Sequence, residues 1–281
     1  MNKAISFLFL FCFSILSSSG QLIVSLEPTK KQYASGEAMN MKLTISNNTG
    51  SPVELSGKGN IPWLDLHVSH VQTNGELPQT RFANFPKVNI PSGKSVSRII
   101  DLRFFYDLSH DGYYKAVAVI RPPDLRNLYS SGDALFSVLS GMPIWSQSIK
   151  TRNGDRRKYA VCGIVENKKQ KIFIQVKDGD TGGPINTVGA GEWLTFFKPQ
   201  IKIDSLSNLH VLFLKTPTIY CRTTVSPDGA RSALVYYQRM AGTQPTLVYG
   251  SNGTVDVQGG IPFNPFAKPD KSIRDATQIP R

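Results

Sequence analysis

Residues 39–46, MNMKLTIS, decide the fold class of this chain. Apolar side chains at Met39, Met41, Leu43 and Ile45 alternate with polar side chains at the positions that follow each of them. Successive side chains of a β-strand point to opposite faces of a sheet, so this alternation predicts a strand with one buried face and one solvated face. The Asn-Asn-Thr-Gly run at 47–50 predicts the turn that ends it.

The same pattern continues through the rest of the first half of the chain. Further alternating or apolar segments lie at residues 22–26, 53–55, 64–68, 96–102 and 134–139. Residues 114–120 are apolar on both faces apart from Lys115, as expected of a central strand. Short strands separated by turns at this spacing predict a β-sandwich.

The second half is also predicted to be β structure. Candidate strands lie at residues 159–165, 171–177, 200–204, 209–214, 218–225, 233–238, 247–249 and 254–257. Turn-forming sequences such as Asp178-Gly179-Asp180 and Asn252-Gly253 stand between them. Consecutive short strands with tight turns predict an antiparallel meander.

The first twenty residues predict export. Lys3 forms a short positive region, residues 4–16 are almost continuously apolar, and small residues at 17–20 are typical of a signal peptidase site. The apolar run is shorter than the ~20 residues that span a bilayer. We therefore expect a cleaved signal peptide, with Gln21 as the first mature residue, no transmembrane segment after cleavage, and a secreted, periplasmic or cell-envelope location.

Four segments resemble the framework of bacterial immunoglobulin-like domains. They are Tyr33-Ala34-Ser35-Gly36-Glu37, the strand ending Ile45-Ser46-Asn47, Pro91-Ser92-Gly93-Lys94 and the run Asp107-Leu108-Ser109-His110-Asp111-Gly112-Tyr113-Tyr114. The resemblance covers about residues 22–121 and implies a tyrosine corner, in which the Tyr114 hydroxyl bonds to upstream backbone. The order of the motifs is also similar to small bacterial proteinase inhibitors with this fold, which implies an inhibitory loop at 103–113.

Part of the second half resembles secreted β-propellers. The resemblance rests on residues 204–213, on Tyr220 and on Ser226-Pro227-Asp228-Gly229. Propeller blades take ~40–45 residues and a closed ring needs at least ~4 of them, so this half is too short for a complete propeller. It implies a small closed sandwich or barrel, or a ring completed by self-association.

We therefore predict an all-β protein, with an N-terminal immunoglobulin-like β-sandwich and a second, smaller antiparallel β domain. The expected organisation is a signal peptide at 1–20, the sandwich at 21–140, a linker at 141–157, the meander domain at 158–258 and an extended tail at 259–281.

Charge points to an anionic partner. The chain has 32 basic and 20 acidic residues, a net charge of +12. The expected partner is a protein or an anionic glycan or envelope surface, without specific nucleic-acid binding. The densest basic runs are 155–158 and 168–171, and a solvated surface is the alternative interpretation of both.

No sequence motif indicates a catalytic, cofactor or metal site. His67 and His70 are three apart on a predicted strand, so they face opposite sides. The run 178–183 lacks the ligand spacing of a calcium loop, and His210 lies in an apolar strand. We expect no cofactor, no metal and no catalytic residues.

Two cysteines lie beyond the expected signal peptide, and several aromatic residues lie near predicted loops. Cys162 and Cys221 are a candidate disulfide in an oxidising compartment, and two buried free thiols are the alternative. The aromatic residues near loops are Phe104, Phe105, Tyr106, Tyr113, Trp193, Phe196 and Phe197. Such side chains either fill a core or anchor a sugar or a protein partner.

The sequence thus predicts an exported, non-catalytic binding or structural protein of the cell envelope or extracellular space. One alternative is a protease inhibitor acting through the N-terminal domain. The other is a glycan-acting hydrolase, which needs two carboxylates facing one cleft. The acidic residues that lie close enough in the C-terminal sequence to supply them are Asp178, Asp180, Glu192 and Asp204.

Overall fold

The computed structural model describes residues 21–81, 84–123 and 127–267. These residues form β-strands and one 3-10 helix, η1 (Leu102–Phe104). The expected signal peptide at 1–20 and residues 268–281 of the expected tail lie outside the described residues. Within those ranges, no helix has the length and apolar character needed to cross a bilayer. The prediction of an all-β fold with several antiparallel sheets is confirmed.

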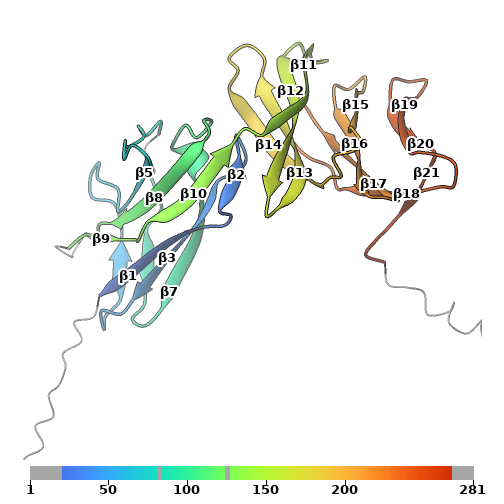
Figure 1. Ribbon diagram of the computed structural model, residues 1–281. Coiled ribbons are helices and arrows are strands. Elements are labelled where there is room, and N and C mark those ends of the chain that lie inside the picture. The colour runs from blue at the N-terminus through green and yellow to red at the C-terminus, as the bar shows by residue number, and fades with distance from the viewer. Residues whose placement is uncertain (1–20, 82–83, 124–126, 268–281) are drawn as a thin grey trace, which may run out of the picture.

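The N-terminal half contains two main sheets around one core (Figure 1). The first has the order β1 (Leu22–Pro28), β3 (Asn40–Asn47) and β7 (Ser95–Asp101). The second has the order β2 (Gln32–Ala34), β10 (Ala134–Leu139), β8 (Gly112–Ile120) and β5 (Leu64–His70), with β9 (Tyr129–Ser130) beside β8. Short strands β4 (Val53–Leu55) and β6 (Val88–Ile90) pair with each other.

Alternation along the strands explains this core. In β3 the side chains of Met41, Leu43 and Ile45 are buried, as the sequence pattern predicts. They meet buried side chains of β8 and β10 in a single apolar cluster. The Tyr114 hydroxyl donates a hydrogen bond of 2.9 Å to the His110 carbonyl, which is the upstream backbone contact that the resemblance implied for this residue.

The C-terminal half is a stack of sheets (Figure 1). One is an antiparallel meander of β11 (Met142–Lys150), β12 (Arg156–Glu166), β13 (Lys169–Asp178) and β14 (Pro184–Glu192). The next has the order β15 (Gln200–Ile203), β16 (Leu209–Thr216), β17 (Ile219–Val225), β18 (Val235–Arg239) and β21 (Gly260–Phe263). A hairpin of β19 (Thr246–Tyr249) and β20 (Val255–Gln258) follows.

The middle sheet of this stack is apolar on both faces. Val211 and Phe213 of β16 face a core shared with the β11–β14 sheet. Leu212 and Leu214 of the same strand face a second cluster, which includes Leu247 of the β19–β20 hairpin. Strand β16 therefore lacks the polar alternation of β3, because neither of its faces meets water.

Several strands occur where the sequence predicts none, among them the short strands β2, β6 and β9 of the N-terminal half. Residues 142–150 of the expected linker form β11, and residues 184–192 form β14. The start of the expected tail contributes β21, at residues 260–263.

The candidate disulfide between Cys162 and Cys221 is not formed, and both cysteines are free and buried. Cys162 lies on the face of β12 opposite to Val161, in an apolar cluster with Ala34 and Phe173. Cys221 lies in the core between the two large C-terminal sheets, on the side that Val161 faces. The pleat of β12 therefore separates the two thiols.

Candidate functional site

The two halves of the chain meet along the outer face of the β12–β14 strands. The Ser35 carbonyl accepts hydrogen bonds from the Thr187 hydroxyl at 2.7 Å and from Gln175 Nε2 at 3.3 Å. Glu37 and Thr187 also form an isolated parallel β-bridge. Ala34 and Leu139 of the N-terminal half pack against Cys162, Ile164 and Phe173. Backbone polar contacts and a small apolar cluster thus fix this junction.

Gly36 permits the close approach of the halves. Its φ of +78° lies in the left-handed region that glycine adopts at little cost. A Cβ at this position would stand 2.7 Å from Thr187 Oγ1. The glycine therefore serves both the turn and the contact across the junction.

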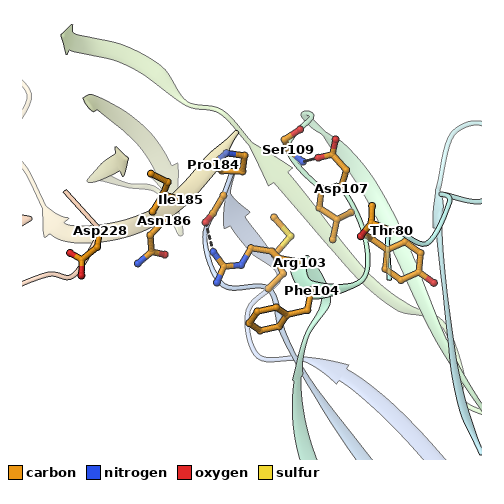
Figure 2. Close-up of a pocket in the computed structure, with 13 residues that line it drawn as sticks. Thr80, Arg103, Phe104, Asp107, Ser109, Pro184, Ile185, Asn186 and Asp228 are labelled. Atoms are coloured by element: carbon orange, nitrogen blue, oxygen red, sulfur yellow. Dashed lines mark hydrogen bonds between the residues drawn. The ribbon is translucent and has the colours of Figure 1, made fainter. Parts of the chain in front are cut away.

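A cleft of about 510 Å³ opens beside this junction (Figure 2). One wall comes from η1 and the segment that follows it, and the other from the start of β14 and the turn after β17. The lining residues are Gly36, Met39, Thr80, Arg103, Phe104, Tyr106, Asp107, Leu108, Ser109, Pro184, Ile185, Asn186 and Asp228. Three other cavities in the described residues are smaller, with volumes of about 420, 440 and 210 Å³.

Arg103 is fixed by its neighbours in the N-terminal wall. Its Nη2 lies 2.7 Å from Asp101 Oδ2, and its Nη1 donates to the Gly36 carbonyl at 2.7 Å. The Asp101 carboxylate thereby offsets the Arg103 charge. Phe104, the next residue, is 60% exposed and supplies an apolar surface in the cleft.

Two carboxylates in the lining carry negative charge. A hydrogen bond from the Ser109 side chain lowers the pKa of Asp107, and one from the Ser226 side chain lowers the pKa of Asp228. Neither carboxylate takes part in an ion pair within the described ranges. The cleft combines an exposed aromatic ring with two ionised carboxylates from opposite halves of the chain.

The segment at 103–113 is held to the rest of the N-terminal half by buried side chains and hydrogen bonds. Tyr106 and Leu108 are buried, the Phe105 carbonyl accepts from the Thr80 N–H at 2.8 Å, and the Ser35 hydroxyl donates to the Ser109 carbonyl at 2.7 Å. A loop held in this way forms a wall of the cleft.

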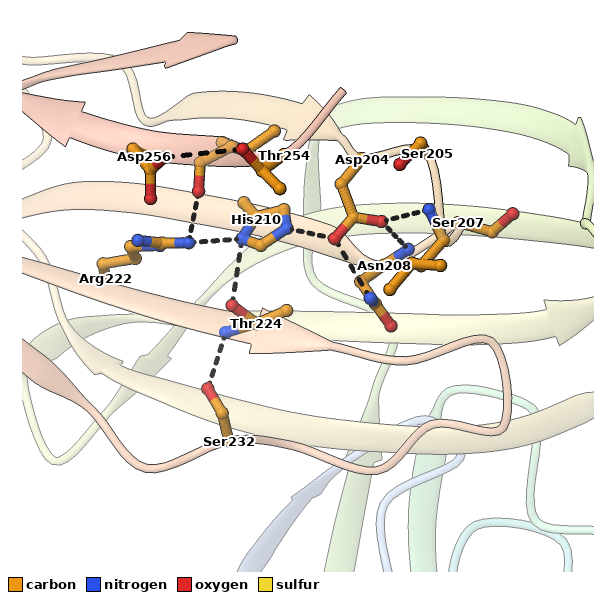
Figure 3. A network of polar contacts seen from close by, with 12 residues as sticks. Asp204, Ser205, Ser207, Asn208, His210, Arg222, Thr224, Ser232, Thr254 and Asp256 are labelled. Atoms are coloured by element: carbon orange, nitrogen blue, oxygen red, sulfur yellow. Dashed lines mark hydrogen bonds and ion pairs between the residues drawn. The ribbon is translucent and has the colours of Figure 1, made fainter. Parts of the chain in front are cut away.

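A second polar site surrounds His210 in the middle sheet (Figure 3). Its Nε2 lies 2.8 Å from Asp204 Oδ2, and its Nδ1 lies 3.0 Å from both Arg222 Nη2 and Thr224 Oγ1. An arginine can only donate, so Nδ1 is the acceptor, and Nε2–H donates to Asp204. Burial lowers the pKa of His210, and the Arg222 charge adds to this while the hydrogen bond to Asp204 opposes it.

This Asp–His–Thr arrangement is not poised for nucleophilic catalysis. Arg222 already occupies the nitrogen that would have to take the Thr224 proton, and its charge opposes an imidazolium. His210 is also only 5% exposed. The network instead ties Asp204, which follows β15, to strands β16 and β17 and, through Arg222 and the Val255 carbonyl, to β20.

The four carboxylates considered for hydrolysis serve local structure. Asp178 accepts hydrogen bonds within the β13–β14 turn that also holds Asp180. Glu192 lies at the other end of β14, paired with Lys169. Asp204 is bonded to His210 and Asn208. No arrangement of two carboxylates across one cavity results from these positions.

The two histidines of β5 and the aromatic residues near loops occupy separate environments. His67 lies beside Asp65 and Glu76, whereas the ring of His70 packs on Tyr114 with centroids 4.6 Å apart, so the two histidines face opposite sides of β5. Within the described ranges, no group of three or more metal-ligating side chains occurs. Among the aromatic candidates, Tyr106 and Trp193 are buried, whereas Phe104, Tyr113, Phe196 and Phe197 are exposed.

Sequence reasoning named the 103–113 segment but missed the opposite wall of the cleft. Pro184, Ile185 and Asn186 belong to the strand that was not predicted. The sequence marks Asp228 only as part of the propeller-like run 226–229. No local pattern signals such a site, because its walls are more than seventy residues apart in the chain.

No protein-family model matches the chain, and no curated protein matches it. Among solved structures, the chain is similar to the sporulation control protein Spo0M from Bacillus subtilis, with 8% identity, a TM-score of 0.28, and coverage of 58% of this chain and 82% of that chain. A similarity of this degree carries no argument about the fold or the function of this chain.

Proposed function

We propose that this chain is an exported, non-catalytic binding protein of the cell envelope or extracellular space, and that the cleft between its halves holds an extended segment of a partner protein. The observation that carries this proposal is the cleft itself, with its mixed lining contributed by both halves. Ligand sites typically combine an apolar surface with a few placed polar groups.

The chemistry of the cleft favours a segment that is both basic and apolar. Asp107 and Asp228 attract positive charge, and Phe104 provides a surface for an aliphatic or aromatic side chain. The Arg103 charge is already offset by Asp101, so it does not cancel the two carboxylates.

We also propose an immunoglobulin-like fold for the N-terminal half and a propeller-like arrangement for the C-terminal half. The Tyr114–His110 contact and the two sheets around one core support the first. Two successive antiparallel meanders that pack face to face support the second, because propeller blades stack in this way.

Binding to short peptides tests the cleft. We expect full-length protein to bind lysine-rich peptides that contain phenylalanine more tightly than acidic peptides of equal length, without cleaving them. Asp107→Asn with Asp228→Asn removes both charges but keeps acceptor oxygens for the two serine bonds, and Phe104→Ala removes the ring. Each change should weaken binding by roughly tenfold.

The matched control is Phe196→Ala, which removes a similarly exposed ring outside the cleft. Unchanged peptide affinity in the cleft variants, or peptide hydrolysis by the wild-type protein, would contradict the proposed function. Export is tested separately: N-terminal sequencing of the mature protein from outside the cytoplasm should begin at Gln21.

A further inference from the structure

The basic run at 168–171 and the aromatic residues at 193–197 meet at one end of the C-terminal half. The Trp193 N–H donates to the Gln170 carbonyl at 3.0 Å, and Lys169 Nζ lies 2.8 Å from Glu192 Oε1. These contacts place the β12–β13 hairpin beside the loop between β14 and β15.

That loop holds two aromatic rings in solvent. Phe196 is 68% exposed and Phe197 is 40% exposed, and their rings pack edge to face with centroids 5.4 Å apart. The loop beneath them is fixed, because the buried Trp193 donates through Nε1 to the Phe197 carbonyl at 2.8 Å and the Leu194 N–H donates to the Leu214 carbonyl at 2.9 Å. The backbone therefore keeps the rings from folding onto the core.

The lysines of the two neighbouring segments are only partly paired with carboxylates. Lys169 pairs with Glu192, and Lys171 pairs with Glu166. Lys168 and Lys198 are exposed and take part in no ion pair within the described ranges. We call Lys168, Phe196, Phe197 and Lys198 the aromatic tip.

The arginines of the other basic run are paired with aspartates. Arg157 lies 3.2 Å from Asp155 and 3.8 Å from Asp178, and Arg156 lies 3.6 Å from Asp180. Lys158 of that run is exposed and takes part in no ion pair within the described ranges. Of the two runs, the one at 168–171 adjoins the loop that carries the exposed Phe196 and Phe197 rings.

We propose that the aromatic tip attaches this protein to the surface of an anionic lipid membrane. Phenylalanine rings held on a loop can enter the boundary between headgroups and acyl chains, while lysines beside them reach the lipid phosphates. The planes of the two rings stand at 62° to each other, so the pair forms no shared flat platform for a sugar chain, which favours lipid over glycan. This proposal goes beyond the binding function of the cleft and does not depend on it.

Sedimentation with lipid vesicles tests the proposal. We expect the full-length protein to sediment with vesicles of phosphatidylglycerol and phosphatidylcholine, and to remain in solution with vesicles of phosphatidylcholine alone. Added salt should weaken the interaction, because it screens the lysines. Absence of binding to the anionic vesicles at low salt, or equal binding to both vesicle types, overturns the proposal.

Variants separate the two components of the aromatic tip. Lys168→Gln with Lys198→Gln should weaken binding roughly 30-fold, and Phe196→Ala with Phe197→Ala roughly tenfold or more. Phe104→Ala is the matched control and should bind vesicles as the wild type does. The unfolding midpoint of each variant establishes that it is folded.

Two further results count against the membrane. Wild-type vesicle affinity in the double phenylalanine variant contradicts insertion of the rings. Tighter binding to a soluble acidic polysaccharide or acidic peptide than to vesicles, with the same dependence on the four residues, identifies an anionic polymer as the partner and overturns the proposal.

Discussion

The Thr187 hydroxyl donates a hydrogen bond of 2.7 Å to the Ser35 carbonyl, across 152 positions of sequence. Both residues are buried, and the bond joins β14 to the turn that follows β2. It therefore acts at the place where the two halves of the chain meet.

Thr187→Val tests this bond, because valine keeps the shape of the side chain and removes the donor. The Ser35 carbonyl would retain only the longer bond from Gln175. We expect the free energy of unfolding in urea to fall by about 1–2 kcal/mol. Thr195→Val, at an exposed position, should change the free energy of unfolding by no more than about 0.5 kcal/mol. Equal losses in both variants would assign no special role to the junction.

Tyr114→Phe removes the hydroxyl that bonds to the His110 carbonyl. The side chain is buried and the carbonyl loses a partner, so we expect a loss of about 1 kcal/mol in thermal or urea unfolding. The adjacent Tyr113 is 61% exposed, and Tyr113→Phe is the matched control. The role of Tyr114 at this corner is contradicted if the two variants are equally stable.

The His210 network predicts a loss of stability in mild acid. Burial lowers the pKa of His210 in the folded state below its unfolded value of about 6.5. Below that value the unfolded chain takes up a proton before the folded chain does, so the free energy of unfolding falls as the pH decreases. The pKa of Asp204 is also lowered, since hydrogen bonds from His210 and Asn208 outweigh its burial, and this adds a loss of the same sign at lower pH.

His210→Gln checks this dependence. The variant should be less stable than the wild type at pH 7.5, because it disrupts a buried network, but its stability should change less between pH 7.5 and pH 5. Urea unfolding at several pH values measures both quantities. An identical pH dependence in the two proteins would show that His210 does not contribute to it.

Both cysteines should be inert in the folded protein. Burial raises the pKa of Cys162 and the pKa of Cys221 to about 11 each, so very little thiolate is present at pH 8. We expect no reaction of the processed chain with a thiol reagent until urea is added, and then two modified thiols by mass spectrometry. A processed chain that stays unmodified in urea but reacts after reduction would instead contain a disulfide.

The sequence predicts strands well where one face of the strand is solvent-exposed and the other is buried. The apolar alternation at 39–45 predicts β3, which the structure places at Asn40–Asn47. Strand β14 escapes this reasoning because Pro184, Gly189 and Gly191 resemble a loop. Gly189 lies against the ring of Phe173, and a Cβ added at Gly189 would stand 3.3 Å from that ring. Strand β11 is missed for another reason: it is mostly exposed and carries little apolar alternation.

The candidate sites were less accessible to sequence reasoning than the fold. The cleft requires Gly36, Arg103 and Asp228 to come together, and only tertiary structure does this. The parts of the aromatic tip were visible as a basic run and as exposed aromatics. Their meeting depends on the contact of Trp193 with Gln170, which follows from the register of β13 and β14.

The second apolar face of the middle sheet makes the β19–β20 hairpin essential to the solubility of the protein. The β19–β20 hairpin covers Leu212, Leu214 and Tyr220 on this face. Proteolytic cleavage after Arg239 would remove the hairpin and expose this apolar face of the sheet to water. We expect such a fragment to self-associate and aggregate, so aggregation would distinguish it from the intact protein.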